Sequence, residues 1–527
     1  APPGAAWELA EIAGDLWIGT WSHGLWRYRD DRFEALDLLP GSHGAWAVEE
    51  DGRSGLWVGT DDGLFHLADD GDVTRLGAEH GLSRSFIQAL RRDQDGNLWI
   101  GTNGGGLHRL TFDGLRPIEA RIQRIERNRG ALGRQIWELF EDREGHLWVG
   151  TFGGGLERFG EASITTVGPG DGAYRQVNAV LAEPDGCVWL ATHTDGVWHQ
   201  CGDRPTTMLT EADGLPTAGA WTLARDHGGM LWIGTARGLV TVREGELQTV
   251  SVEQGLPNAV VLALHPAQAG GVWVGTNGGL ARVDGDHVEV VDPDRLPSPL
   301  IRGIDEERDG TLWVGTSGAG LVRLAAPDSD EADRVYGTAD GMPGMLVWSL
   351  FRDRQDVLWI GSSGGLSRFV DGTLRTLDSR HGLSPDSVSS ILEDASGGFW
   401  LATPAGIVHL ERPSRDAYFL DQASSVAIEH YGSAEGMGST EFLGGVQPSS
   451  ARSTDGRLWF PSLAGAAVLD PTTLRRPDTR VIPIIEELRV DGALRPTLGS
   501  EQALAAGVRR IELRFTAPTI HAAYRLH

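Results

Sequence analysis

Short runs of apolar and β-branched residues, separated by turns rich in Gly and Asp, recur along the whole chain. One complete set of four runs occupies residues 220–226, 230–235, 239–242 and 247–250. None of these runs is long enough for a helix, and none shows the 3.6-residue period of an amphipathic helix. Short β-prone runs with turn residues between them are typical of antiparallel strands joined by hairpins. The pattern therefore predicts four short strands in this stretch.

The second run of each set carries the motif Leu-Trp-Ile/Val-Gly-Thr or a close variant. Its tryptophan recurs at intervals of 40 to 59 residues from one end of the chain to the other. The anchoring tryptophans are Trp17, Trp57, Trp99, Trp148, Trp189, Trp232, Trp273, Trp313, Trp359, Trp400 and Trp459. Repeated sets of four short strands are typical of the blades of a β-propeller, in which the large indole packs against the next blade. The sequence therefore predicts an all-β chain with 11 four-stranded blades.

The spacing of the anchors predicts three parts. Four blades precede a Gly-rich stretch at residues 160–172, so residues 1–172 are expected to form a partial N-terminal propeller. Seven blades follow, and residues 173–475 are expected to form a complete seven-bladed propeller. Residues 476–527 alternate like the first strands of a β-sandwich and are too few to complete one. The first four blades are either part of a larger seven-bladed ring, which we favour, or a small closed ring.

Charge and composition exclude several classes of partner. The formal net charge of −27 repels nucleic acids and anionic membrane surfaces. All 46 basic residues are Arg, which removes Schiff-base lysines and the lysine of phosphate-binding loops. No apolar run approaches the length of a membrane span. The chain begins at Ala1, which suggests a mature or excised segment.

The two cysteines of the chain flank one predicted hairpin. If Ala191 faces Val197 across the turn, then Cys187 faces Cys201, because both pairs are centred on residue 194. Cross-strand neighbours have Cα atoms about 4.5–5.5 Å apart, which suits a disulfide. We expect a Cys187–Cys201 bond, with two buried free thiols as the alternative. A disulfide would favour an oxidising compartment.

No motif in the chain predicts catalysis, a cofactor or a metal. Gly-rich strings such as residues 101–106 join two strands and open no helix, so they are read as turns rather than phosphate loops. His193 and His199 share a hairpin but lack a third ligand at metal spacing. Acidic clusters at hairpin tips are expected to be solvated turns. A carboxylate pair assembled from distant blades stays open, so a carbohydrate-active lyase or glycosidase is kept as an alternative.

Several segments resemble a known family, the two-component regulator propeller. Residues 98–107, Leu-Trp-Ile-Gly-Thr-Asn-Gly-Gly-Gly-Leu, look like its core motif, and Gly-Leu pairs such as Gly214-Leu215 match its joints. Residues 441–461 look like its closing blade, and residues 513–518 resemble the start of the triple-tyrosine β-sandwich that follows it. The resemblance covers nearly the whole chain.

The resemblance implies a non-enzymatic, periplasmic region of an inner-membrane receptor that senses a small-molecule ligand. It also implies a membrane span and a cytoplasmic histidine kinase or diguanylate cyclase outside this chain, and a homodimer in the full receptor. A protein-interaction scaffold without a small ligand is the other alternative to a sensor.

One position in each blade is predicted to face the central channel. Eleven residues before each anchor, near the start of the innermost strand, aromatic and hydrogen-bonding residues alternate. Such a ring suits a polar, ring-shaped ligand such as a saccharide, whereas tryptophans wedged between blades are the alternative. We expect the turns after the second strand, including those at His193, Arg237, Asn277 and Ser317, to rim the same face. The proposed ligand-binding residues are Asn178, Trp221, Arg302, Trp348 and Ser389.

Overall fold

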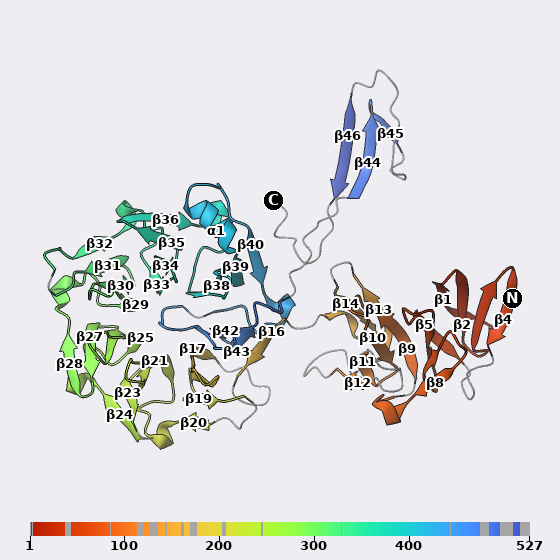
Figure 1. Cartoon of the computed structure of the whole chain (residues 1–527), viewed down its shortest axis with the longest axis horizontal. Coiled ribbons are helices and arrows are strands. Elements are labelled where there is room, and N and C mark those ends of the chain that lie inside the picture. Colours follow the sequence, from red (N-terminus) through yellow and green to blue (C-terminus); the bar gives the residue numbers. More distant parts are fainter. Residues whose placement is uncertain are drawn as a thin grey trace. The chain divides into compact units, whose positions relative to one another are not determined.

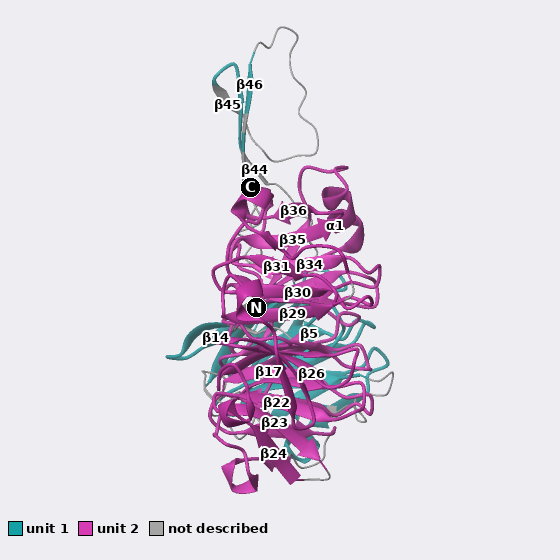
Figure 2. Ribbon diagram, turned by 90° about the vertical axis from the view of Figure 1, so that its left-hand side faces the viewer, with its two compact units in different colours: residues 1–160, 476–527 teal, residues 161–475 magenta. Residues whose placement is uncertain are grey.

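The computed structural model forms two compact units (Figure 2), residues 1–160 with 476–527, and residues 161–475. It describes residues 2, 4–36, 44–84, 86–112, 121–125, 135–142, 145–159, 163–168, 176–202, 207–243, 246–327, 329–442, 444–474, 484–495 and 510–516. The expected boundaries at residues 172/173 and 475/476 lie outside these described residues. Among the described residues, no helix is both long and apolar enough to cross a membrane.

The second unit is a ring of four-stranded antiparallel sheets around a central channel (Figure 1), with the first strand of each sheet innermost. From inner to outer strand, the first three sheets are β17 (Val177–Ala182), β18 (Val188–Thr192), β19 (Val197–Gln200) and β20 (Thr207–Leu209); β21 (Ala220–Arg225), β22 (Leu231–Thr235), β23 (Gly238–Arg243) and β24 (Glu246–Val250); and β25 (Val261–Pro266), β26 (Val272–Thr276), β27 (Gly279–Asp284) and β28 (His287–Val290). The next three are β29 (Ile301–Glu306), β30 (Leu312–Thr316), β31 (Leu321–Leu324) and β32 (Arg334–Tyr336); β33 (Val347–Arg352), β34 (Leu358–Ser362), β35 (Gly365–Val370) and β36 (Thr373–Leu377); and β37 (Ser390–Glu393), β38 (Phe399–Thr403), β39 (Gly406–Leu410) and β40 (Ile428–Tyr431).

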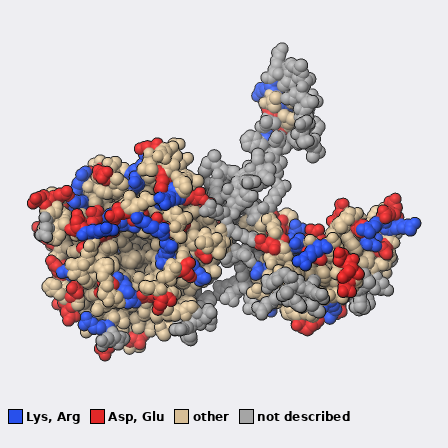
Figure 3. Space-filling view, in the orientation of Figure 1, with Lys and Arg blue, Asp and Glu red and all other residues tan. Residues whose placement is uncertain are grey.

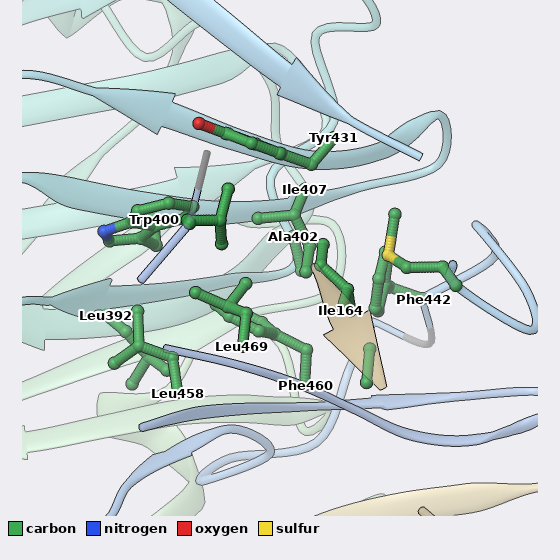
Figure 4. Packing of buried hydrophobic residues seen from close by; sticks show 13 residues of the cluster. Ile164, Leu392, Trp400, Ala402, Ile407, Tyr431, Phe442, Leu458, Phe460 and Leu469 are labelled. Atoms are coloured by element: carbon green, nitrogen blue, oxygen red, sulfur yellow. The ribbon is translucent and has the colours of Figure 1, made fainter. Parts of the chain in front are cut away.

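The seventh sheet of the second unit closes the ring with strands from both ends of the unit. It consists of β41 (Ala451–Arg452), β42 (Leu458–Ser462), β43 (Gly465–Leu469) and, as its outer strand, β16 (Ile164–Val167). The register pairs Ile164 with Leu469. Ile164 is buried among side chains of the sixth and seventh sheets, including Ile407 and Phe460 (Figure 4).

The sequence analysis placed residues 164–167 with the N-terminal blades, and the structure corrects this assignment. The four residues Ile-Thr-Thr-Val complete the last sheet of the ring, so the ring includes a strand that lies before residue 173. A run of four residues contains no sequence signal that indicates the strand with which it pairs.

The first unit contains four blades. They are β1 (Ala6–Ile12), β2 (Asp15–Thr20), β3 (Leu25–Arg29) and β4 (Arg32–Leu36); β5 (Ala45–Glu50), β6 (Leu56–Thr60), β7 (Gly63–Leu67) and β8 (Val73–Leu76); β9 (Ile87–Arg92), β10 (Leu98–Thr102), β11 (Gly106–Thr111) and β12 (Arg121–Arg124); and, with three described strands, β13 (Ile136–Glu141), β14 (Leu147–Thr151) and β15 (Gly155–Phe159). A separate antiparallel sheet has the order β45 (Ala493–Arg495), β44 (Ile484–Val490) and β46 (Ile511–Thr516). The structure thus confirms the all-β propeller class.

The repeated motif forms the second strand of each blade, and each of its residues has a physical role. In β22, a Cβ on Gly234 would lie 2.6 Å from Thr222 and 2.9 Å from Val261 of the next blade, so only Gly permits this approach. Thr235 Oγ1 donates a hydrogen bond to the carbonyl of Gly238 and closes the following turn. The indole of Trp232 is buried against the next blade.

A carboxylate six residues before the anchoring tryptophan accepts a hydrogen bond from its indole in most blades. Asp226 Oδ2 lies 2.8 Å from Trp232 Nε1, while its other oxygen accepts from the amide of Met230. The equivalent pairs are Trp99–Asp93, Trp148–Asp142, Trp189–Glu183, Trp313–Glu307, Trp359–Asp353 and Trp400–Asp394. These carboxylates therefore orient the core indoles of their blades.

One short helix, α1 (Arg412–Phe419), lies between β39 and β40 and was not predicted. Its Arg415 is buried, donates to the carbonyl of Gly397 at 3.0 Å and lies 3.8 Å from the ring centroid of Phe399. The helix sits inside one blade and leaves the order of the strands unchanged.

Candidate functional site

Four of the five ligand-binding positions predicted from the sequence occupy a β-bulge in an inner strand. In β21 the register passes from Ala220↔Thr235 to Thr222↔Gly234, so Trp221 is the extra residue. Asn178, Arg302 and Trp348 occupy the same place in β17, β29 and β33, and Ser389 directly precedes β37. A bulge releases one side chain from the alternation of the strand and re-aims it. The shared register explains why this position differs in chemistry from its apolar neighbours.

Two of the five predicted residues are buried and bonded within the ring. Asn178 Nδ2 donates to the carbonyl of Ala220 in the next blade at 2.7 Å. Ser389 Oγ donates to the carbonyl of Ala402 within its own blade at 3.2 Å. These side chains stabilise the inner wall of the ring, so their bonding groups are engaged by the protein itself.

Trp221 is half-buried and packs on the turn of the preceding blade. Its ring lies 5.3 Å from that of His193, with an interplanar angle of 79°. His193 belongs to one of the turns that were expected to rim the mouth of the channel. This inner-strand tryptophan and this rim turn therefore do meet on one face of the ring.

Arg302 and Trp348 lie against a segment of the chain that was not foreseen. Residues 444–450, which we call the strap, precede β41. Arg302 donates from Nη1 to the carbonyl of Gly445 at 3.0 Å and from Nε to Ser317 Oγ at 3.1 Å. A Cβ on Gly445 would lie 3.3 Å from the indole of Trp348, and one on Gly444 would lie 3.3 Å from Ser389. Arg302, Trp348 and Ser389 thus converge on the strap.

Gln447 ties the strap to the inner strands of several blades. Its side chain accepts from the amide of Leu350 at 2.9 Å and donates to the carbonyl of Ile304 at 2.7 Å. Its backbone exchanges hydrogen bonds with Leu262 and Leu264 of β25, and Thr222 Oγ1 of β21 donates to its carbonyl at 2.9 Å. One residue therefore links four inner strands, β21, β25, β29 and β33.

The strap changes the expectation for the last blade. The channel-facing position eleven residues before the anchor Trp459 falls on Pro448, but the inner strand of this blade, β41, contains only Ala451 and Arg452. The preceding residues have left the sheet to bond with the other blades.

Arg302 is the one charged residue among the five predicted ligand-binding residues. Burial lowers the pKa of the Arg302 guanidinium, and the structure shows no ion pair for it among the described residues. The five predicted residues include no carboxylate, imidazole or thiol. These five residues offer indoles, one guanidinium, an amide and a hydroxyl group, which can bind a polar ligand and orient it.

The inner strands carry their charged residues at the opposite end. Arg352 of β33 pairs with Asp305 of β29 at 2.6 Å and with Glu307 at 3.0 Å, and Arg225 of β21 pairs with Glu183. In Figure 3, arginine side chains border the hollow at the centre of the ring. These ion pairs join adjacent blades, and the sequence analysis did not single them out.

The structure joins Cys187 and Cys201 by a disulfide, with Cα atoms 4.2 Å apart. The register of the hairpin pairs Ala191 with Val197, as expected. His199 Nε2 lies 3.6 Å from Cys201 Sγ, and its ring stacks on Trp189 at 4.0 Å. The three side chains could group around a metal only with free thiolates, which the disulfide removes.

Four segments of the chain match the family model described as two component regulator propeller: residues 81–104, 130–153, 341–364 and 382–405. No curated protein matches the chain. Among solved structures, the chain is similar to the extracellular domain described for the hybrid two-component system BT3049 from B. thetaiotaomicron, with 20% identity and a TM-score of 0.66 over 96% of this chain and 67% of that one. For BT4673 of the same organism, the values are 17%, 0.50, 94% and 68%.

Each matched segment includes the anchor strand of one blade. Residues 382–405 begin at Gly382, whose φ of 105° ends a short 3-10 turn, and pass through the buried Leu383 and the anchor Trp400 to the turn after Thr403. The likeness to the solved structures supports the same fold. Four repeats of this chain thus match the model of the two-component regulator propeller family.

Proposed function

We propose that this chain is the extracytoplasmic ligand-sensing region of a bacterial signal-transduction receptor and has no catalysis of its own. The family of its repeats supports a regulatory role, and the similar solved structures are described as extracellular domains of two-component systems. In the full receptor, a membrane span and a cytoplasmic output domain would lie outside this chain, and the receptor would be a homodimer. The location would be periplasmic, which suits the disulfide.

The observation that carries the proposal is the contact between the channel-facing residues and the strap. Trp348 and Arg302 touch Gly445, and two residues further on Gln447 bonds to four inner strands. A ligand that binds at Arg302, Trp348 or Ser389 therefore contacts or displaces a segment that bonds to several inner strands of the ring. Such a ligand would shift the population of strap positions, and this shift is a signal that other domains can use.

The indoles would supply most of the binding energy. A polar ring ligand such as a saccharide stacked on Trp221 or Trp348 would gain about 1–3 kcal/mol from one aromatic face. Trp348→Ala should therefore weaken binding about tenfold or more. Trp198→Ala, at a half-buried tryptophan in the third strand of the first blade of the ring, serves as the matched control and should leave the affinity unchanged.

A thermal-stabilisation screen of the whole chain against saccharides and metabolites tests the proposal. We expect one or more compounds to raise the unfolding temperature of the ring, with no conversion of the compound during incubation. Turnover of an oligosaccharide would instead identify a propeller enzyme. Capture of a protein partner, with no compound stabilising the chain, would identify an interaction scaffold.

A further inference from the structure

The hairpin of β18 and β19 brings three side chains that can bind a metal to one place. Cys187 directly precedes β18, whereas His199 of β19 and Cys201 lie on the other arm of the hairpin. One ligand atom from each, the two sulfurs and an imidazole nitrogen, lies within 4.8 Å of the others. Spacing along the chain does not reveal this group, because its members come from both arms.

His199 occupies a position that recurs in the repeat, opposite the anchor tryptophan of its blade. His66 and His409 occupy the same position in two other blades, where each bonds to a carboxylate, at 2.9 Å and 2.8 Å respectively. Nε2 of His199 lies instead 3.6 Å from Sγ of Cys201. The histidine of this hairpin therefore faces sulfur where its equivalents face oxygen.

The separation of this nitrogen and this sulfur matches two ligands of one metal ion. A zinc ion holds a thiolate sulfur at about 2.3 Å and an imidazole nitrogen at about 2.0–2.1 Å, so at a tetrahedral angle the two ligand atoms lie about 3.6 Å apart. Nε2 of His199 and Sγ of Cys201 are already at this distance. The indole of Trp189 stacks on the imidazole, with ring centroids 4.0 Å apart, and fixes its orientation.

The hairpin holds the two cysteines close together by bonds other than the disulfide. Val188 pairs with Gln200 in the register that ends beside them, and the amide of Glu183 donates to the carbonyl of Cys187 at 2.8 Å. The Cα atoms of the cysteines lie 4.2 Å apart. After reduction the two sulfurs therefore stay on neighbouring positions, and they can move to the separation of about 3.8 Å that two thiolate ligands of one zinc ion have.

We propose that this hairpin is a redox-gated site for a thiophilic metal ion, in which Cys187, Cys201 and His199 bind Zn²⁺ or Cu⁺ once the disulfide is reduced. Thiolate sulfur combined with imidazole nitrogen is a ligand set that suits both ions. With three protein ligands, a zinc ion keeps its fourth position for water. This inference goes beyond the proposed sensor function and does not depend on it.

The step that opens the site is thiol–disulfide exchange with a dithiol reductant. Cys201 is half-buried and Cys187 is buried, so a thiolate of the reductant attacks Sγ of Cys201, and Cys187 leaves as a thiolate that takes up a proton. The second thiol of the reductant then displaces Cys201, which also takes up a proton, and the reductant leaves as a disulfide after giving two electrons and two protons. A bound metal ion replaces these two protons on the sulfurs.

The test measures metal binding by the whole chain before and after reduction. A phosphine reduces the disulfide without adding a competing thiol and is removed under exclusion of air. The protein is then titrated with Zn²⁺ or with Cu⁺ against a chromophoric chelator of that ion. We expect the reduced chain to bind one equivalent of at least one ion about a hundredfold or more tightly than the oxidised chain does, because only the reduced chain offers thiolates.

Variants of the three ligands locate the site. Replacing both Cys187 and Cys201 with Ser should lower the affinity to that of the oxidised chain. His199→Gln keeps a polar side chain of similar length and should weaken binding by the reduced chain about tenfold or more. His193→Ala is the matched control, because His193 is exposed in the same hairpin and its ring contacts Trp221; its affinity should stay within about twofold of the wild type.

The inference is wrong if reduction raises the affinity for neither ion, if the double serine variant binds as tightly as the reduced wild type, or if His199→Gln does so. Circular dichroism and the unfolding temperature check the fold of each protein. A reduced wild type that has lost its fold would also overturn the inference, because the hairpin must hold the ligands without the disulfide.

Discussion

The four blades of the first unit and the closed ring of the second are built from one repeat, yet they bury it differently. Leu156 of β15 and Leu239 of β23 occupy the same register, each opposite the Gly of the anchor motif. Leu156 is 65% exposed and Leu239 is 0% exposed. The local sequence of the two hairpins is nearly the same, so the difference comes from the next blade, which covers Leu239. A blade of this kind acquires its core from its neighbours.

Closure of the ring also determines whether its channel-facing side chains are covered or exposed. In the ring, β16 completes the seventh sheet from the outside, while Gln447 of the strap bonds to four inner strands from the inside. In the first unit, the equivalent bulge residues include Trp7 and Trp137, which are both exposed. Two of the four bulge residues of the first unit are thus open to solvent, while the other two, Trp46 and Gln88, are buried.

The largest expected effect tests whether the neighbouring blade supplies the core. Leu239→Ala should lower the free energy of unfolding of the ring by about 2–5 kcal/mol, because it leaves a cavity between two blades. Leu156→Ala should change the stability of the first unit by less than about 0.5 kcal/mol, because little contact is lost. Denaturant unfolding, followed separately for the two units, measures both. Equal losses would mean that Leu156 is covered in solution.

The strap can be loosened at a single residue. Gln447→Ala leaves the amide of Leu350 and the carbonyl of Ile304 without their partner, so the ring should lose about 2–3 kcal/mol while the first unit is unaffected. Gln268→Ala is the matched control, since its exposed amide also bonds to a carbonyl, that of Glu307; its loss should stay below about 0.5 kcal/mol. Calorimetry of the wild-type protein and of the two variants measures these losses in stability. A Gln447→Ala variant as stable as the wild type would show that this side chain does not hold the strap.

The disulfide should stabilise only the ring. Replacing both Cys187 and Cys201 with Ala releases a short loop in the unfolded chain and should cost the ring about 2–3 kcal/mol. The unfolding transition of the first unit is the internal control. Thiol labelling of the unfolded, unreduced wild-type protein should find no reactive thiol; two labelled thiols would contradict the bond.

The smallest expected effect concerns pH and belongs to the first unit. The pKa of Glu8 is about 7 in the folded chain and 4.5 in the unfolded one. Between these values the folded state keeps a proton that the unfolded state has released, so the first unit loses stability as pH rises from 4.5 to 7. Glu8→Gln stays neutral and should gain about 1 kcal/mol at pH 8, after allowance for partial exposure, and nothing at pH 4.

Glu11→Gln, at an exposed position of the same strand, is the control for the pH experiment and should show no such difference between pH 4 and pH 8. Urea unfolding at both pH values gives the comparison. A gain by Glu8→Gln at pH 4 that equals the gain at pH 8 would exclude ionisation as its cause.

Much of the fold could be predicted because its signals are local. The Leu-Trp-Ile/Val-Gly-Thr runs and their close variants mark the second strand of each blade. The Gly-Leu pairs mark the turns that precede many inner strands. The centring of Cys187 and Cys201 on residue 194 gave their hairpin register. A further local signal was missed, the acid six residues before the tryptophan. It recurs in most blades and could have been found from spacing alone.

The candidate site was predictable only in part. The bulge position stands out in the sequence because it alternates between aromatic and hydrogen-bonding residues. Whether such a residue is exposed depends on segments far away in the chain. Arg302 bonds to Gly445 and Thr222 to Gln447, contacts between residues 143 and 225 positions apart. Nothing near Arg302 in the sequence indicates the strap.

The sequence by itself determined the repeat, the strand order within a blade and the identity of the channel-facing position, because these depend on hairpins and on periodicity over a few residues. Only the tertiary structure decided that Ile164 closes the last sheet, that the strap leaves that sheet and bonds through Gln447 to four others, and that Trp7 and Trp21 stay exposed while Trp348 is covered. These outcomes depend on which blade lies next to which. A blade buries its apolar face only against a neighbouring blade, and the sequence of one repeat does not indicate which segment of the chain forms that neighbour.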